Sequence, residues 1–249
     1  MQTGLLLPLS LTAQNAIKVD PLEEKPKVKT TRHGELTVNT FCLGRLKVNC
    51  FIVSDRNLNC IVIDPGARAE VILDFIRNNR LKLLAYVLTH SHLDHISALD
   101  ECYKAMPAPV AMHPDENDWA FCEKNQWEPY YPLTKPVKIE RPLKHWQSFK
   151  DGNLNYTIIH TPGHSAGSVC IWFPQQKIIF SGDTLFAGNI GRTDLHKSSF
   201  RSLLRSLGAF LALPPETKIY PGHGQTTTVK TELATNPYFT HVPDKTNVK

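Results

Sequence analysis

Ligand-type side chains are densest in the segment THSHLDH, which spans residues 89–95 and follows a predicted buried strand. Side chains two residues apart in an extended backbone point the same way, so His90 and His92 can present two imidazoles to one cation. Asp94 and His95 follow at once and could serve a second cation. Neutral imidazole and carboxylate are groups that Zn²⁺, Fe²⁺ and Mn²⁺ accept as ligands. The segment therefore predicts a metal site.

Three more candidate ligands lie further along the chain, each near the end of a predicted strand and beside a glycine. They are His164 in HTPGHSAGS, Asp183 in FSGDTLF and His223 in YPGHG. Each of them alone is typical of a turn residue. Together with THSHLDH, and in this order, they indicate one shared site.

Strands and helices that alternate along the chain must position these residues. Apolar runs bounded by Gly or Pro predict strands within residues 38–44, 48–55, 59–66, 83–89, 155–163, 168–174, 177–183 and 217–224. Apolar residues at helical spacing predict helices over residues 67–79 and 200–213. The fold class is therefore mixed α and β, with strands dominating.

We expect a single domain over residues 34–240, an irregular N-terminal extension over residues 1–33 and a tail over residues 241–249. Within the domain, residues 112–150 are a loop-rich connection that carries seven aromatic residues. Long connections of this kind either cover a satellite hydrophobic cluster or form the wall of a substrate pocket. The sequence leaves both interpretations open.

The composition is that of an ordinary globular protein, with 41% hydrophobic and 20% charged residues and a formal net charge of +5. It excludes collagen, coiled coil and wholesale disorder, and the charge forms no long basic run of the kind that nucleic-acid binders carry. The six cysteines lie far apart without a Cys-x-x-Cys pair, so we expect reduced thiols.

The apolar stretch over residues 5–11 is far too short to span a bilayer. A secretory signal would carry a Lys or Arg before its apolar stretch, but the first Lys of this sequence is Lys18. We therefore expect a cytoplasmic protein that binds neither nucleic acid nor membranes. The sequence does not determine the oligomeric state.

The motifs HxHxDH, TPGH, SGDTLF and PGHG, in this order, resemble the signature of the metallo-β-lactamase superfamily of hydrolases. The chain is most similar to short, bacterial-type members of its glyoxalase II group, which hydrolyse hydroxyacylglutathione thioesters. The resemblance covers residues 38–239 and includes NCFIV, VIDPG, SGDTLFAGNIGRTD and TTTVKTELATNPYF. It implies an α/β (α+β) fold, the αββα four-layer sandwich, with both sheets inside and the metals at one edge of the sheets.

The resemblance also implies a cofactor of two divalent metal ions, zinc first, with iron or manganese as alternatives. It implies a dimetal-bridged hydroxide that attacks the acyl carbonyl of a small-molecule thioester, with Asp94 and Asp183 as the catalytic residues. The implied metal ligands are His90, His92 and His164 for one ion, Asp94, His95 and His223 for the other, and Asp183 as the bridge.

The thiol carrier of the substrate stays open, with glutathione as the leading candidate. Full-length glyoxalase II enzymes carry an added C-terminal helical region that supplies much of the glutathione pocket. Only 25 residues follow Gly224 in this sequence, too few for such a region. Another small thiol, coenzyme A and a simple ester are the alternatives.

Several residues beside the candidate ligands have two interpretations each. Asp64 either accepts an imidazole N–H, which would fix a ligand tautomer, or caps a turn. Arg192 in GRTD either meets a substrate carboxylate or pairs with Asp194, and the pair is favoured. Three threonines are expected to hold loops through backbone hydrogen bonds, namely Thr89, Thr161 and Thr184.

Two other functions compete with the thioester hydrolase. GNIGRTD also resembles the persulfide dioxygenase branch, in which His90, His164 and Asp183 would bind a single iron that activates O₂. That branch departs from PGHG at its last motif, whereas this chain keeps YPGHG. The second alternative is a non-catalytic metal or redox module.

Overall fold

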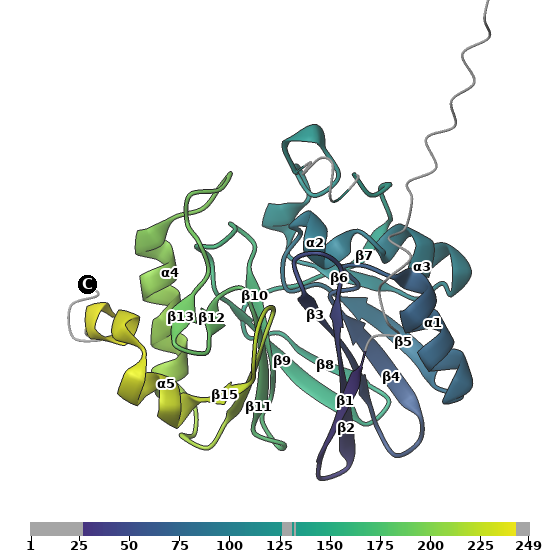
Figure 1. The fold of residues 1–249 in the computed structure, drawn as a ribbon, viewed down its shortest axis with the longest axis horizontal. Coiled ribbons are helices and arrows are strands. Elements are labelled where there is room, and N and C mark those ends of the chain that lie inside the picture. Colours follow the sequence, from purple (N-terminus) through teal and green to yellow (C-terminus); the bar gives the residue numbers. More distant parts are fainter. Residues whose placement is uncertain (1–26, 126–130, 132, 243–249) are drawn as a thin grey trace, which may run out of the picture.

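Two β-sheets pack face to face in the middle of the molecule, and helices cover the outer face of each sheet (Figure 1). The computed structural model describes residues 27–125, 131 and 133–242. The helices α1 and α3 lie on one sheet, and α4 and α5 lie on the other (Figure 1). The expected αββα four-layer arrangement is therefore confirmed.

The first sheet has seven strands that are neighbours in sequence order. Its first four strands pair antiparallel and its last four pair parallel, so β4 belongs to both parts. The strands are β1 (Val28–His33), β2 (Leu36–Leu43), β3 (Val48–Ser54), β4 (Asn59–Ile63), β5 (Lys82–Val87), β6 (Val110–Met112) and β7 (Ile139–Pro142).

The second sheet has six strands in the order β15-β14-β11-β10-β9-β8. Only β11 and β14 run parallel within it. Its strands are β8 (Ser148–Asp151), β9 (Leu154–His160), β10 (Val169–Phe173), β11 (Ile178–Gly182), β14 (Lys218–Pro221) and β15 (Thr227–Thr228). A small separate hairpin follows β11, formed by β12 (Leu185–Phe186) and β13 (Asn189–Ile190).

Five α-helices complete the described part of the chain. They are α1 (Ala69–Asn78), α2 (Leu93–Ile96), α3 (Leu99–Ala105), α4 (Phe200–Leu207) and α5 (Val229–Thr235). The helix expected over residues 200–213 continues beyond α4 only as a 3₁₀ segment, Gly208–Ala212. No helix of the described residues is long and apolar enough to cross a membrane.

Strand alternation distributes the apolar side chains over three interfaces. In β3, Cys50 and Ile52 join the cluster under α1 and α3, whereas Phe51 and Val53 join the cluster between the sheets. The same alternation in β10 sends Cys170 toward α4. Both faces of these central strands are buried, which explains why they read as continuous apolar runs in the sequence.

The expected N-terminal extension over residues 1–33 is wrong for its last six residues. Val28–His33 form β1, whose pairing with β2 runs from Val28 opposite Phe41 to His33 opposite Leu36. This edge strand, VKTTRH, is mostly exposed and buries no apolar face, so it gives no hydrophobic pattern. The rest of the expected extension, residues 1–26, lies outside the described residues, as do residues 243–249 of the expected tail.

Candidate metal centre

All seven candidate ligands lie at one edge of the two sheets. His90 follows β5, His164 lies in the loop between β9 and β10, Asp183 follows β11, and His223 follows β14. The strands β5, β11 and β14 each run parallel to a neighbour, so carboxyl ends gather at this edge. The last residues of these three strands are buried.

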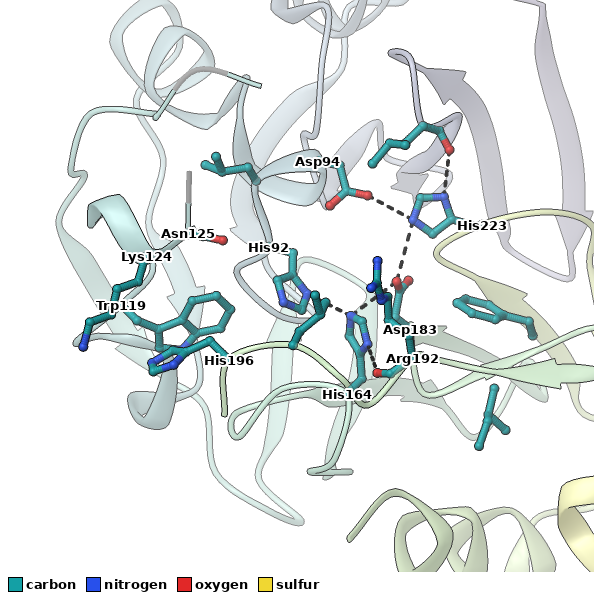
Figure 2. A pocket seen from close by; sticks show the side chains of 15 residues that line it. His92, Asp94, Trp119, Lys124, Asn125, His164, Asp183, Arg192, His196 and His223 are labelled. Carbon is teal, nitrogen blue, oxygen red and sulfur yellow. Dashed lines mark hydrogen bonds and ion pairs between the residues drawn. The ribbon is translucent and has the colours of Figure 1, made fainter. Parts of the chain in front are cut away.

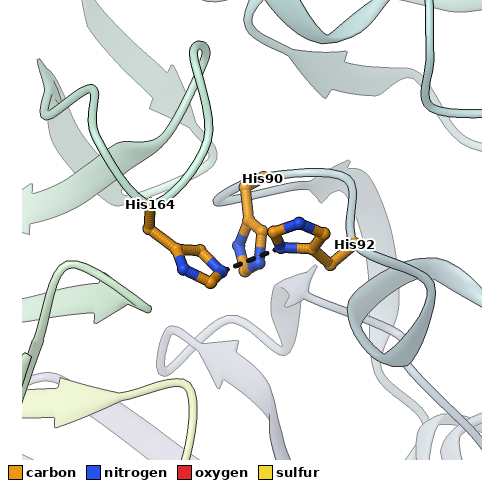
Figure 3. A group of neighbouring side chains, drawn as sticks. All are labelled: His90, His92 and His164. Atoms are coloured by element: carbon orange, nitrogen blue, oxygen red, sulfur yellow. Dashed lines mark hydrogen bonds between the residues drawn. The ribbon is translucent and has the colours of Figure 1, made fainter. Parts of the chain in front are cut away.

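The first group of ligand atoms belongs to three histidines. One nitrogen each from His90, His92 and His164 lies within 4.8 Å of the others (Figure 3). His92 Nδ1 and His164 Nε2 are 2.8 Å apart. His92 is the N-cap residue of α2, and its ring centroid lies 4.9 Å from that of His90. We call His90, His92 and His164 the first cluster.

A second group is formed by Asp94, His95 and His223, whose ligand atoms also lie within 4.8 Å of one another. His223 Nε2 is 3.1 Å from Asp94 Oδ2, and His95 Nε2 is 3.7 Å from the same oxygen. Asp94 and His95 both belong to the short helix α2. We call these three residues the second cluster.

Asp183 lies between His164 of the first cluster and His223 of the second (Figure 2). Its Oδ1 is 3.4 Å from His95 Nε2, and its Oδ2 is 3.4 Å from His164 Nε2. The close approach depends on Gly222, because a Cβ at that position would lie 2.2 Å from Asp183 Oδ1. One carboxylate therefore faces histidines of both clusters.

The second nitrogen of three rings is held by an acceptor. His164 Nδ1 donates to the carbonyl oxygen of Arg192 at 2.9 Å, and His223 Nδ1 donates to that of Leu46 at 3.0 Å. His95 Nδ1 donates to Asp64 Oδ2 at 2.9 Å. In a neutral ring, each of these bonds places the proton on Nδ1 and leaves the Nε2 lone pair for a cation, as a metal-binding imidazole requires.

The electrostatics of the first cluster favour neutral rings. Burial lowers the pKa of His90 well below its usual value. Burial, together with the neighbouring His164, lowers the pKa of His92 to about 3. Both imidazoles are therefore unprotonated near pH 7, which is the form that binds a cation.

The second cluster behaves differently because of its carboxylates. Burial acts against a charged His95, but Asp94 and Asp183 outweigh it and raise the pKa of His95 well above its usual value. Burial also acts against an ionised Asp183, but His95 and His164 hold the pKa of Asp183 well below its usual value. The carboxylates are therefore charged and attract positive charge to this cluster.

A cavity of about 420 Å³ opens onto the two clusters. Figure 2 shows Trp119, Lys124 and His196 at the end away from His223. Its lining is His92, Asp94, His164, Asp183 and His223 on the cluster side, with Leu46, Leu93, Trp119, Lys124, Asn125, Phe186, Ile190, Arg192, Leu195 and His196 around them. The site can therefore admit a small molecule between apolar walls.

Comparison with known proteins identifies the family. A family model of the metallo-beta-lactamase superfamily matches residues 43–223. The probable metallo-hydrolase YqgX of Bacillus subtilis is 37% identical over 183 residues, which are 71% of this chain and 85% of that protein. This chain belongs to the metallo-β-lactamase superfamily. That is a superfamily of metallo-hydrolases that bind divalent metals.

Other proteins also resemble the chain. A hydroxyacylglutathione hydrolase of Bdellovibrio bacteriovorus is 35% identical over 164 residues, 66% of this chain and 58% of that protein. The crystal structure of the BLEG-1 B3 metallo-beta-lactamase has a TM-score of 0.77 and 32% identity, and covers 82% of this chain and 99% of its own. The crystal structure of TTHA1623 in a di-iron-bound form has a TM-score of 0.72 and 36% identity, and the match covers 80% of this chain and 98% of that one.

Buried polar atoms without a hydrogen-bond partner indicate whether the site can hold the divalent metals that the superfamily binds. His90 Nε2, His95 Nε2 and Asp183 Oδ1 are buried without a hydrogen-bond partner. Buried polar atoms of this kind are costly and rare in native proteins. All three belong to the candidate ligands and are free to receive a cation, so the residues present fit the metals.

For Asp64 the structure shows the imidazole acceptor, and for Arg192 it shows the favoured pair with Asp194. Asp64 accepts the His95 ring and also accepts from the backbone N–H of Thr89 at 2.8 Å. Arg192 donates twice to Asp194, at 2.7 Å each, and also lines the cavity.

The three threonines hold loops, as expected. Thr161 Oγ1 and Thr184 Oγ1 are 2.8 Å apart and join the segments that carry His164 and Asp183. Thr89 Oγ1 donates to Asp64 Oδ2 at 2.6 Å, next to His90.

The aromatic connection over residues 112–150 contributes both to the pocket and to the core. Trp119 is 2% exposed and lines the cavity. Tyr131 instead joins the core cluster under α1 and α3, and Trp146 is 57% exposed. Trp127 and Tyr130 lie outside the described residues.

Sequence reasoning missed two residues that support the ligand loops. Glu116 is buried in the 3₁₀ segment Pro114–Glu116 and accepts hydrogen bonds from Ser91 and Gly167. Asn125 donates to the carbonyl oxygen of Ser91 at 2.6 Å. Neither residue sits in a motif, and the connection that carries them gives no periodic signal, so only the folded structure reveals them.

Proposed function

We propose that this protein is a metal-dependent thioester hydrolase of the hydroxyacylglutathione hydrolase (glyoxalase II) type. Its ligands would be the first cluster for one divalent cation and the second cluster for another, with Asp183 shared. The observation that carries the proposal is the Asp183 carboxylate, which faces His95 with one oxygen and His164 with the other, at 3.4 Å each. Asp94 and Asp183 are the proposed catalytic residues.

Two bound divalent cations would polarise the acyl carbonyl and lower the pKa of a water molecule toward neutrality. The chain's own residues do the positioning. Asp183 keeps the two clusters in register, and its negative charge offsets part of the positive charge gathered there. Asp94 lines the cavity with Oδ2 3.1 Å from His223 Nε2, where it can accept a hydrogen bond from the attacking water.

A thioester is compatible with this site. A thiolate leaves readily without protonation, so the cavity needs no dedicated acid opposite the nucleophile. The similarity to the Bdellovibrio hydroxyacylglutathione hydrolase points the same way. We therefore propose a small-molecule thioester as substrate, with glutathione as the first carrier to test.

Zinc is the proposed metal, because imidazole and carboxylate are ligands that zinc accepts. Iron is the main alternative, supported by the di-iron form of TTHA1623.

We also propose a cytoplasmic location. All six cysteines are free thiols, which is typical of reducing compartments.

The decisive experiment is anaerobic turnover of S-lactoylglutathione and a panel of other thioesters, with metals counted in the same preparation. Hydrolysis without oxygen by protein holding about two metals per chain is the expected result. Oxygen consumption with glutathione persulfide, one iron per chain and no thioester turnover would assign the protein to the dioxygenase branch. Two metals with hydrolysis of β-lactams alone would also overturn the proposal.

A further inference from the structure

Glu116 is a fully buried carboxylate that joins two ligand-bearing loops. Its Oε2 accepts from the backbone N–H of Ser91 at 2.9 Å and from Ser91 Oγ at 2.5 Å. Its Oε1 accepts from the backbone N–H of Gly167 at 2.6 Å. Ser91 stands between His90 and His92, and Gly167 lies three residues after His164. One side chain therefore spans both segments that supply the first cluster.

The fit around this carboxylate is tight. A Cβ at Gly167 would lie 2.6 Å from Glu116 Cγ and 2.8 Å from Glu116 Oε1, so only glycine allows the loop to approach. Asn125 adds a second tie, because its side chain donates both to Ser91 and to the carbonyl oxygen of Ala120. The loop that holds His90 and His92 is thus fixed from outside the cluster.

The Glu116 carboxylate is buried among donors that carry no charge. The side chain is 0% exposed, and its three hydrogen bonds come from neutral donors. Burying a carboxylate is costly, and neutral donors offset the cost only in part. A cation held by the adjacent histidines would stabilise this charge, and the charge would in turn favour the cation.

We propose that Glu116 is a positioning residue for the metal of the first cluster, acting by holding the loops of His90, His92 and His164 in register. This inference rests on the proposed function, because it assumes that the first cluster binds a cation. Glu116 reaches the cluster only through Ser91 and Gly167, so it contacts neither the metal nor the substrate. Replacing Glu116 should therefore lower the metal affinity of a protein that still folds.

The chain offers a matched control in Glu232. This side chain is 1% exposed and also accepts from three neutral donors, the N–H of Gly188, the Asn236 amide and the Thr227 hydroxyl. It ties α5 to the loop after β12 and touches no segment of the first cluster. Glu232→Gln therefore makes the same chemical change at the same burial, away from the proposed metal.

The experiment compares the unaltered protein, Glu116→Gln and Glu232→Gln. Zn²⁺ affinity is measured by competition with a chromophoric chelator, and stability of the metal-free proteins by urea unfolding. We expect both variants to lose stability, but only Glu116→Gln to lose affinity for one Zn²⁺ by about 10–100-fold. The Co²⁺-loaded Glu116→Gln protein should also show an altered visible absorption spectrum.

Equal Zn²⁺ affinity in Glu116→Gln and the unaltered protein would overturn the proposal. An equal loss of affinity in both Gln variants would overturn it too, because a general loss of stability would then suffice. Should Glu116→Gln fail to fold, Ser91→Ala removes only the hydroxyl donor, and an unchanged Zn²⁺ affinity there would count against the proposal. Failure of the unaltered protein to bind either Zn²⁺ or Fe²⁺ would instead refute the proposed function itself.

Discussion

Asp64 accepts the Nδ1–H of His95 at 2.9 Å, and through Thr89 it also reaches His90 in the other cluster. Thr89 Oγ1 donates to Asp64 Oδ2 at 2.6 Å and lies 3.1 Å from His90 Nδ1. Since the hydroxyl proton is given to Asp64, Thr89 can only accept from His90, which leaves His90 Nε2 free. One buried carboxylate thus sets the tautomer of one ring in each cluster.

Asp64→Asn should therefore weaken both proposed metal sites. Asp64 now accepts hydrogen bonds from His95 and Thr89. The amide of Asn would place its own N–H group against one of these donors, so the hydrogen bond from His95 or from Thr89 is lost. We expect metal affinity to fall by about 10–100-fold, measured by chelator competition. Asp55→Asn is the control, because Asp55 is a buried acceptor for Asn57, Asn59 and Asn153 away from the site. Similar losses in both variants would contradict the prediction.

Asp183→Ala should abolish thioester turnover and lower the metal content of the purified protein. Among the candidate ligands described, Asp183 has carboxylate oxygens near histidines of both clusters, so its removal disturbs both. The check is metal analysis beside a turnover assay, with Asp74→Ala on the exposed face of α1 as control. Full metal occupancy with near-normal turnover would remove Asp183 from the shared position.

Asp94→Asn tests the proposed role of Asp94 in orienting the attacking water. The amide keeps the shape of the side chain but removes its charge and one acceptor. We expect kcat to fall by about 100-fold, in the range of lost acid–base assistance, with a smaller change in KM. Steady-state kinetics at saturating metal measure the effect. A variant that loses only metal affinity, and regains full kcat when metal is added, would restrict Asp94 to metal binding.

That the candidate ligands gather at one edge of the sheets could be predicted from the sequence, because they stand in short motifs at or soon after strand ends. Asp183, for example, comes directly after β11, and His90 comes three residues after the end of β5, so local pattern and chemistry coincide. Glu116 could not be predicted, because its partners Ser91 and Gly167 meet it only through tertiary packing. The edge strand β1 was missed for the opposite reason, since pairing with β2 rather than burial of an apolar face forms it.

Acidification should release metal from the two clusters in sequence. Metal binding needs neutral imidazoles. Burial lowers the pKa of His92 to about 3, whereas Asp94 and Asp183 raise the pKa of His95 against the effect of burial. As the pH falls, protons therefore compete first at the second cluster, and about two metals per chain near pH 8 should become about one below pH 6.

Metal counts after equilibration at each pH check this order. The variant His223→Ala, which lacks a second-cluster ligand, should retain the acid-resistant metal and show one release step. Loss of both metals in a single step from the unaltered protein would contradict the order.

Trp119→Ala tests whether the aromatic connection shapes the substrate pocket. Trp119 is buried, lines the cavity and packs edge-on against His92 with ring centroids 5.1 Å apart. We expect the substitution to lower the free energy of unfolding by ~3–5 kcal/mol, as large-to-small changes in a core do, and to raise KM or alter acyl preference.

Phe173→Ala separates the two effects of Trp119→Ala. Phe173 is fully buried between the sheets and is not among the residues that line the cavity. Its truncation should destabilise the protein by a similar amount, yet leave KM and acyl preference unchanged. Urea unfolding and steady-state kinetics on the same thioester panel measure both quantities. If the two variants change KM equally, Trp119 affects the substrate only through stability, and its pocket role is wrong.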